Sequence, residues 1–96
     1  MTINIHSIHF HIDNDLEAFI EKKVNKLIKL DRNIISTDVF LKLSKAESYS
    51  NKIAEIKLKY PGSDFFAKRK SDTFEESTTQ VFQALRKQIL KNKSKN

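Results

Sequence analysis

The chain has 96 residues, with 18 lysines and arginines against 12 aspartates and glutamates, a formal net charge of +6 and no cysteine. This length supports one hydrophobic core and excludes a second catalytic domain, so we expect residues 1–96 to form a single domain. The absence of cysteine excludes disulfides and thiolate metal sites, and a single glycine argues against a phosphate-binding loop. The excess of positive charge favours a polyanionic partner, nucleic acid first.

The N-terminal residues predict a strand and give no sign of membrane targeting. Apolar and polar residues alternate from Ile3 to Ile12, with a shift of phase near Ser7, which indicates one strand with a bulge or a kink. The chain starts without a basic region followed by an apolar one, and no apolar run has the roughly 18 residues of a membrane span. We therefore expect a cytoplasmic protein with no membrane partner.

A helical pattern of apolar residues follows the first strand in the sequence. Asp13-Asn14-Asp15 forms an N-cap cluster, and apolar residues then recur at intervals of three and four up to Leu30. A second helical pattern begins at Thr73, which can cap the first turn together with Glu76, and continues without glycine or proline into the basic C-terminal end.

Three further strands are predicted between these helices. Residues 35–43 and 54–60 alternate between apolar and polar side chains, and the short link between them indicates an antiparallel pair. Pro61-Gly62-Ser63-Asp64 is a turn sequence, residues 65–68 form a short fourth strand, and Arg69-Lys70-Ser71-Asp72 leads into the last helix.

This order predicts an α+β fold, β-α-β-β-β-α, with a four-stranded mixed sheet and two parallel helices packed on one face. Strands joined through a helix are parallel with a right-handed crossover, whereas hairpins give antiparallel pairs. The basic C-terminal halves of both helices should then lie side by side.

These C-terminal halves are the candidate nucleic-acid site, because they carry more cations than are needed to stabilise the helix dipoles. Lys23 falls inside the apolar arc of its helix, where it either covers the edge of the core or contacts a ligand. Lys68, Arg69 and Lys70 are either auxiliary RNA contacts or merely exposed. The candidate RNA-binding residues are Lys22, Lys23, Lys26, Lys29, Arg86, Lys87, Lys91 and Lys93.

No residue pattern indicates catalysis or a metal site. His9 and His11 would share one face of the first strand, but no acid or cysteine stands at a matching position, so outward polar histidines are the preferred interpretation. First-turn acids such as Glu75 and Glu76 are explained by capping and the helix dipole. Phe65-Phe66 could stack on bases, although a half-buried strand needs at least one of them in the core.

Several runs carry a resemblance that covers essentially the whole chain. They are Phe10-His11-Ile12-Asp13, the helix with Leu16, Lys23, Lys26 and Leu27, Val39-Phe40-Leu41-Lys42-Leu43, Phe65-Phe66-Ala67-Lys68, Thr73-Phe74-Glu75-Glu76-Ser77, and the run from Ala84 to Lys93. With this order, length and charge, the chain resembles the short ribosome hibernation-promoting factors and the related ribosome-associated inhibitor, protein Y. The last run is similar to the family's Arg-Gln-Leu-x-Lys-x-Lys ending, with Lys87 where arginine is usual.

The resemblance implies a ribosome hibernation factor of stress and stationary phase that is not an enzyme. It implies binding to the small (30S) ribosomal subunit and its 16S rRNA, and inhibition of translation by occlusion of the mRNA and tRNA sites. It implies no cofactor and no small-molecule substrate, and we expect a monomer off the ribosome. It places the family's RNA-contacting bases on Lys23, Lys26, Lys87, Lys91 and Lys93. The chain ends without the dimerisation domain of the long forms, so ribosome pairing would need another factor.

Two other functions fit the same elements. A double-stranded RNA-binding domain has a similar α-β-β-β-α core, and it would bind plain duplex RNA as well as it binds ribosomal subunits. A protein-interaction module would use the open face or an edge of the sheet, and its binding would be insensitive to salt.

Overall fold

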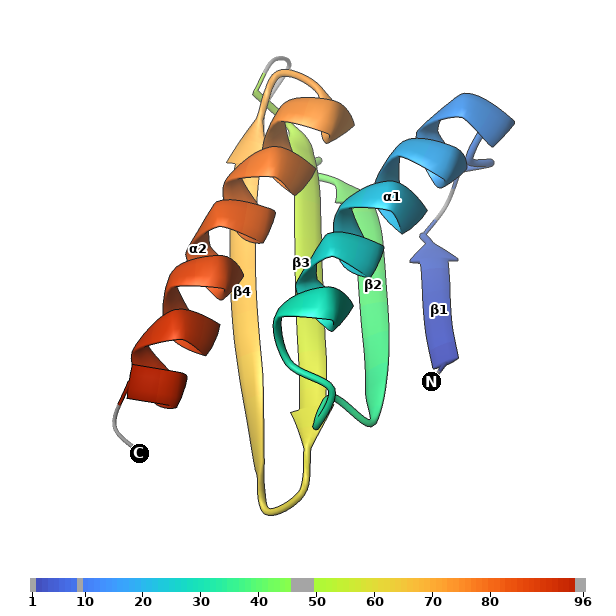
Figure 1. Cartoon of the computed structure of the whole chain (residues 1–96). Helices are drawn as coiled ribbons and strands as arrows, with labels where there is room; N and C mark the ends of the chain where they lie inside the picture. The colour runs from blue at the N-terminus through green and yellow to red at the C-terminus, as the bar shows by residue number, and fades with distance from the viewer. Residues whose placement is uncertain (1, 9, 46–49, 95–96) are drawn as a thin grey trace.

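The computed structural model describes residues 2–8, 10–45 and 50–94. Its elements confirm the predicted order and form two layers, a sheet and a pair of helices (Figure 1). No helix in the described ranges is long and apolar enough to cross a membrane. The elements are β1 (Thr2–Ser7), α1 (Asn14–Leu30), β2 (Ser36–Leu43), β3 (Lys52–Tyr60), β4 (Ser63–Ser71) and α2 (Phe74–Ser94).

The sheet has the strand order β1-β2-β3-β4, with β1 and β2 parallel and the other neighbours antiparallel. Both helices cover the same face and run in the same direction, as Figure 1 shows. Their starts are fixed by caps, because the Asp13 carboxylate accepts from the Leu16 amide at 2.8 Å and the Thr73 hydroxyl accepts from the Glu76 amide at 3.1 Å. The predicted fold class is therefore confirmed.

The core lies between the helices and the sheet. Alternate residues of β2 and β3, such as Val39 and Ile56, are fully buried against the helices, and their neighbours face the opposite, open side. Each fully buried leucine or isoleucine stabilises the fold by roughly 1.5–3 kcal/mol relative to an exposed one. The helical side of the core is formed by Leu16, Ile20, Val24, Leu27, Phe74, Val81, Leu85 and Ile89.

The first strand is shorter than predicted. β1 ends at Ser7, and the following described residues have no regular structure before α1. Phe10 fits the alternating pattern of a strand in the sequence, but its ring stacks on Phe74 at the start of α2, with 5.0 Å between centroids. The chain leaves the sheet to make this contact. His11 is therefore not on a strand face, and His9 lies outside the described residues.

The fourth strand is longer than predicted, so the expected loop before α2 is wrong. Pairing with β3 continues as far as Lys52 opposite Ser71, and the turn is reduced to Pro61 and Gly62, whose φ of 85° suits glycine. Lys68, Arg69 and Lys70 thus belong to β4. Backbone pairing extends the strand although its side chains are charged.

Two lysines join the helices along their junction. The Lys23 ammonium of α1 lies 5.5 Å from the ring centroid of Phe19 and 5.2 Å from that of Phe82 in α2. At the C-terminal ends of the two helices, the Lys93 ammonium donates to the Leu30 carbonyl at 2.6 Å. Lys23 therefore packs over the edge of the core, and the contact between Lys93 and Leu30 joins the two C-terminal helix ends, which lie together because the helices run in parallel.

Replacing Lys23 by alanine should lower the free energy of unfolding by about 1 kcal/mol, because two cation–π contacts are lost. Lys22 is the matched control, since it is exposed on the same turn of α1 and contacts no acidic side chain among the described residues. Lys22→Ala should change stability by less than about 0.5 kcal/mol. Urea denaturation of both variants measures the difference, and equal values would show that the aromatic contacts stabilise nothing.

Candidate nucleic-acid interface

Three exposed lysines form a row along α1. Lys22, Lys26 and Lys29 fall within about 60° of one another on the helix, as their spacing predicts. A surface hollow of about 450 Å³ follows this row. Although Glu21 also lines the hollow, no acidic oxygen in the described part of the chain comes within ion-pair distance of these ammonium groups.

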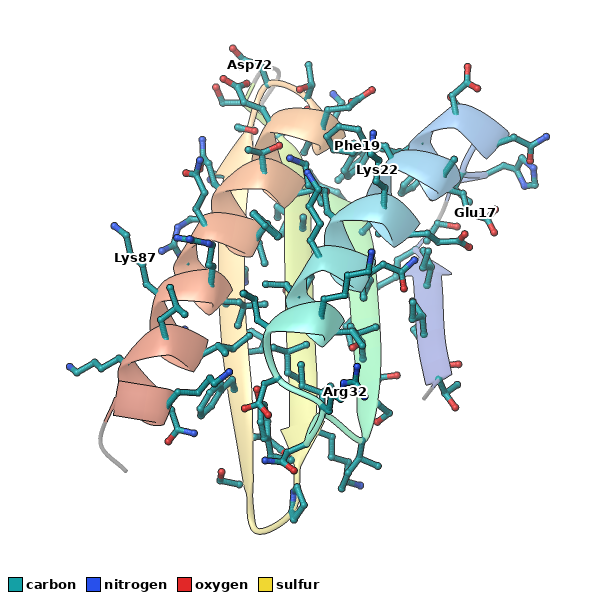
Figure 2. The ribbon with its side chains drawn as sticks, viewed as in Figure 1. Glu17, Phe19, Lys22, Arg32, Asp72 and Lys87 are labelled. Carbon is teal, nitrogen blue, oxygen red and sulfur yellow. The ribbon has the colours of Figure 1, made fainter. Side chains whose placement is uncertain are left out.

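The basic residues of α2 divide between its two sides. Arg86 follows Phe82 by one turn and lies about 40° from it, on the side that faces α1. Lys87 projects on the opposite side of α2, away from α1 (Figure 2), where it lines a hollow with Arg69 of β4. Lys91 lines the next hollow on that outer side together with Phe65. The eight candidate residues therefore form two adjoining groups and not one patch. One group lies on α1 and at the junction of the helices, and the other lies on the outer side of α2.

Lys23 and Lys93 belong to the group at the helix junction, together with the row on α1. Their ammonium groups already contact aromatic rings and a backbone carbonyl, respectively. Both contacts leave part of each ammonium open, because Lys23 is half-buried and Lys93 is exposed. Lys23 and Lys93 thus lie beside the other candidates, and their contacts also hold α1 and α2 together.

The three auxiliary candidates do not act together, because neighbouring strand residues point to opposite faces. Lys68 faces the open side of the sheet, where its ammonium lies 3.6 Å from the Glu55 carboxylate. Arg69 faces α2 and lines the hollow that contains Lys87. Lys70 follows the alternation to the open face. Only Arg69 therefore lies near the helical candidates.

The open face of the sheet carries paired charges. Lys42 lies 2.9 Å from Glu55, a carboxylate whose side chain is only 16% exposed and which Lys68 also approaches. Lys57 lies 3.4 Å from Asp64 on the neighbouring strand. In contrast, five cations of the helical layer contact no acidic side chain in the described ranges: Lys22, Lys26, Lys29, Arg86 and Lys87. Uncompensated positive charge therefore gathers over the helices.

Phe65 and Phe66 have separate surroundings. Phe65 is half-buried and packs on Tyr60 with 4.8 Å between ring centroids, whereas Phe66 is 52% exposed on the open face. One of the two is thus part of the packed interior, as predicted. Burial and, to a smaller extent, the Asp31 carboxylate raise the pKa of Tyr60, so its phenol stays neutral beneath the basic end.

An amide-rich groove beside α2 was not predicted from the sequence. Gln80, Gln83 and Gln88 line a hollow with Arg69 and Lys87, at a place where the prediction considered charge alone. The repeat of Gln80, Ala84 and Gln88 at intervals of four was a usable signal, because such residues share one helix side. Which neighbour that side faces depends on the position of β4.

The described residues offer no metal centre. They contain no group of three or more histidine, cysteine, aspartate or glutamate side chains that could hold a metal ion. His6 stacks on Phe40 on the open face with 4.9 Å between ring centroids. Its ring is therefore engaged in packing between neighbouring strands.

The fold is similar to that of two solved structures. A ribosomal subunit interface protein from Coxiella burnetii superposes with a TM-score of 0.82 at 24% identity, covering 98% of this chain and 99% of that chain. The N-terminal domain of Thermus thermophilus protein Y gives a TM-score of 0.78 at 19% identity, covering 93% and 96% of the two chains. No curated protein sequence matches the chain.

The family relationship follows from the sequence over nearly its whole length. The sequence model of the family described as Sigma 54 modulation protein / S30EA ribosomal protein matches residues 3–96. This match includes both helices, all the candidate basic residues and the strands that position them. The chain therefore belongs to the Sigma 54 modulation protein / S30EA ribosomal protein family.

Proposed function

We propose that the protein binds the small ribosomal subunit through 16S rRNA and inhibits translation by occluding the mRNA and tRNA sites. The observation that carries the proposal is the contrast between the two faces. On the open face, Lys42, Lys57 and Lys68 lie within ion-pair distance of acids, whereas no acid in the described ranges comes this close to the helical cations Lys22, Lys26, Lys29, Arg86 and Lys87. Such uncompensated cations suit a partner with closely spaced phosphates.

Family membership and the names of similar structures favour a ribosomal partner. The family description includes a ribosomal protein, and the two similar structures are a subunit interface protein and protein Y. A free cytoplasmic protein that acts by binding needs neither a cofactor nor a catalytic group. Blocking a channel needs only a rigid body and sufficient affinity, and the buried core beneath the helices provides this rigidity.

The affinity in this mechanism comes mainly from counterion release. Lysines that neutralise rRNA phosphates release condensed cations, and the fit of the helical layer into an RNA cleft selects the site. For roughly five to eight phosphate contacts, the coefficient for single strands gives a log–log salt slope of about −4 to −6. The exposed ammonium groups of α1 supply part of this slope.

Removing two charges from the helical face should weaken binding to 30S subunits and make the salt slope shallower by about 1.4. The variant is Lys22→Gln with Lys26→Gln, and the matched control is Lys57→Gln with Lys59→Gln on the open face. Each pair removes the same total charge from exposed positions. Co-sedimentation with 30S subunits at a series of salt concentrations measures both affinity and slope.

The control pair should bind like the unmodified protein if the helical face contacts rRNA. Equal losses in both pairs would mean that net charge alone governs binding, and a wild-type slope near zero would contradict the electrostatic mechanism. Plain duplex RNA serves as a competitor in the same assay. Competition as strong as that by free 30S subunits would favour a double-stranded RNA-binding function.

Occlusion predicts competition with the ligands of translation. Subunits loaded with mRNA and tRNA should retain at least tenfold less protein than empty subunits, because the same channel cannot hold both. Pelleting of loaded and empty 30S subunits with the unmodified protein provides the measurement. Undiminished binding to loaded subunits would place the protein outside the channel while leaving its binding to the ribosome intact.

A further inference from the structure

A groove runs along the outer side of α2, between this helix and the edge strand β4. Two surface hollows of about 440 and 220 Å³ follow each other there, and Gln88 lines both. Because they share this residue, we treat them as one feature, the α2–β4 groove. Its lining extends from Gln80 to Asn92, which corresponds to roughly 18 Å along the helix. This length accommodates a few nucleotides of an extended strand.

Side-chain amides line the helical wall of the groove. The Gln88 amide donates to the Phe66 carbonyl at 3.2 Å and so ties the helix to the edge strand. Gln80 and Gln83 are exposed and form no hydrogen bond with the described residues. Ala84 lies beside them and fills little space. An amide presents two donors and one acceptor oxygen, which matches the hydrogen-bonding edges of unpaired bases.

An aromatic ring lies at the other end of the groove. Phe65 lines it together with Gln88, Lys91 and Asn92, and its ring is packed on Tyr60 at 4.8 Å between centroids. The contact with Tyr60 fixes the ring in place, while the side chain remains only partly buried. A fixed, accessible aromatic ring is the kind of surface on which single-stranded bases stack.

The charged residues that line the groove are all basic. Arg69 and Lys87 line the larger hollow, and Lys91 lines the smaller one. One guanidinium nitrogen of Arg69 donates to the Lys68 carbonyl at 2.8 Å, which holds the group against the strand and leaves its other N–H groups for a ligand. Among the residues that the structure describes, no acidic one lines either hollow, so the groove is complementary to a phosphate backbone.

We propose that the α2–β4 groove binds a short segment of unpaired RNA, with one base stacked on Phe65, base edges at the glutamine amides, and phosphates at Arg69 and Lys87. This deepens the proposed function, on which it rests, by naming unpaired RNA as the ligand on the outer side of α2. A base within a duplex cannot stack on Phe65, because both of its faces are covered by neighbouring base pairs. The groove therefore selects unpaired over paired RNA.

The test compares three fluorescent RNA probes of equal length by anisotropy: a six-nucleotide adenine strand, the same backbone without bases, and a duplex of six guanine–cytosine pairs, which stays paired under the conditions of the assay. The unmodified protein should bind the adenine strand about tenfold more tightly than the abasic backbone, because base stacking on an aromatic ring contributes a factor of this order. The unmodified protein should also bind the adenine strand more tightly than the duplex. Equal affinity for the strand and the abasic backbone would mean contact with phosphates alone, or a groove meant for a protein partner, and would overturn the proposal.

Variants of residues in the groove test whether the preference for the adenine strand over the abasic backbone comes from the α2–β4 groove. Phe65→Leu should remove it, whereas Phe66→Leu, the same substitution at the neighbouring residue on the open face, should preserve it. Because Phe65 also packs on Tyr60, a second variant with Gln80→Ala and Gln83→Ala tests exposed positions that do not support the fold. It should lower the preference several-fold without changing the salt slope. A preference that survives in both groove variants would overturn the proposal.

Sedimentation with 30S subunits separates this inference from the proposed function. A protein that binds the subunit but shows no preference for bases refutes the groove alone. A protein that prefers unpaired bases but does not pellet with the subunit refutes the ribosomal target and leaves the chemistry of the groove in place.

Discussion

The parallel packing of two helices on one sheet face is the constraint on which the rest of the structure depends. Because α1 and α2 run in the same direction, their dipoles add, and each helix carries about half a negative charge at its C-terminal end. Two such ends side by side repel each other unless cations lie between or beside them. The Lys93 ammonium on the Leu30 carbonyl supplies such a cation at the junction. The basic end is therefore partly a requirement of the fold.

In the proposed interface, folding and RNA binding share residues at the helix junction. Lys23 lies over the rings of Phe19 and Phe82, so a phosphate that contacts its ammonium must approach from the remaining open side. The exposed lysines of α1 have no such second contact in the described ranges and provide charge without affecting the packing. The proposed interface thus has cations held by intramolecular contacts at its centre, and along its border exposed cations that contact no acidic side chain in the described ranges. Fixed cations lose less side-chain entropy on binding.

The order of elements, the caps and the core stripes were predictable because they depend on local periodicity and on residues a few positions apart. The ends of β1 and β4 were not, because they depend on distant contacts. Phe10 leaves the sheet to stack on Phe74, and the charged residues of β4 stay in the strand through backbone pairing with β3. The basic candidates were recognisable from charge, but their division between two sides of α2 follows from the positions of α1 and β4.

The edge of the sheet at β4 is closed by side chains. The carbonyls of Phe66 and Lys68 accept hydrogen bonds from Gln88 and Arg69, so two of the groups that an added strand would use are already engaged. Unpaired edge strands are the usual starting points for sheet extension and aggregation between copies of a protein. The contacts that shape the α2–β4 groove thus also make pairing between the β4 edges of neighbouring molecules less favourable.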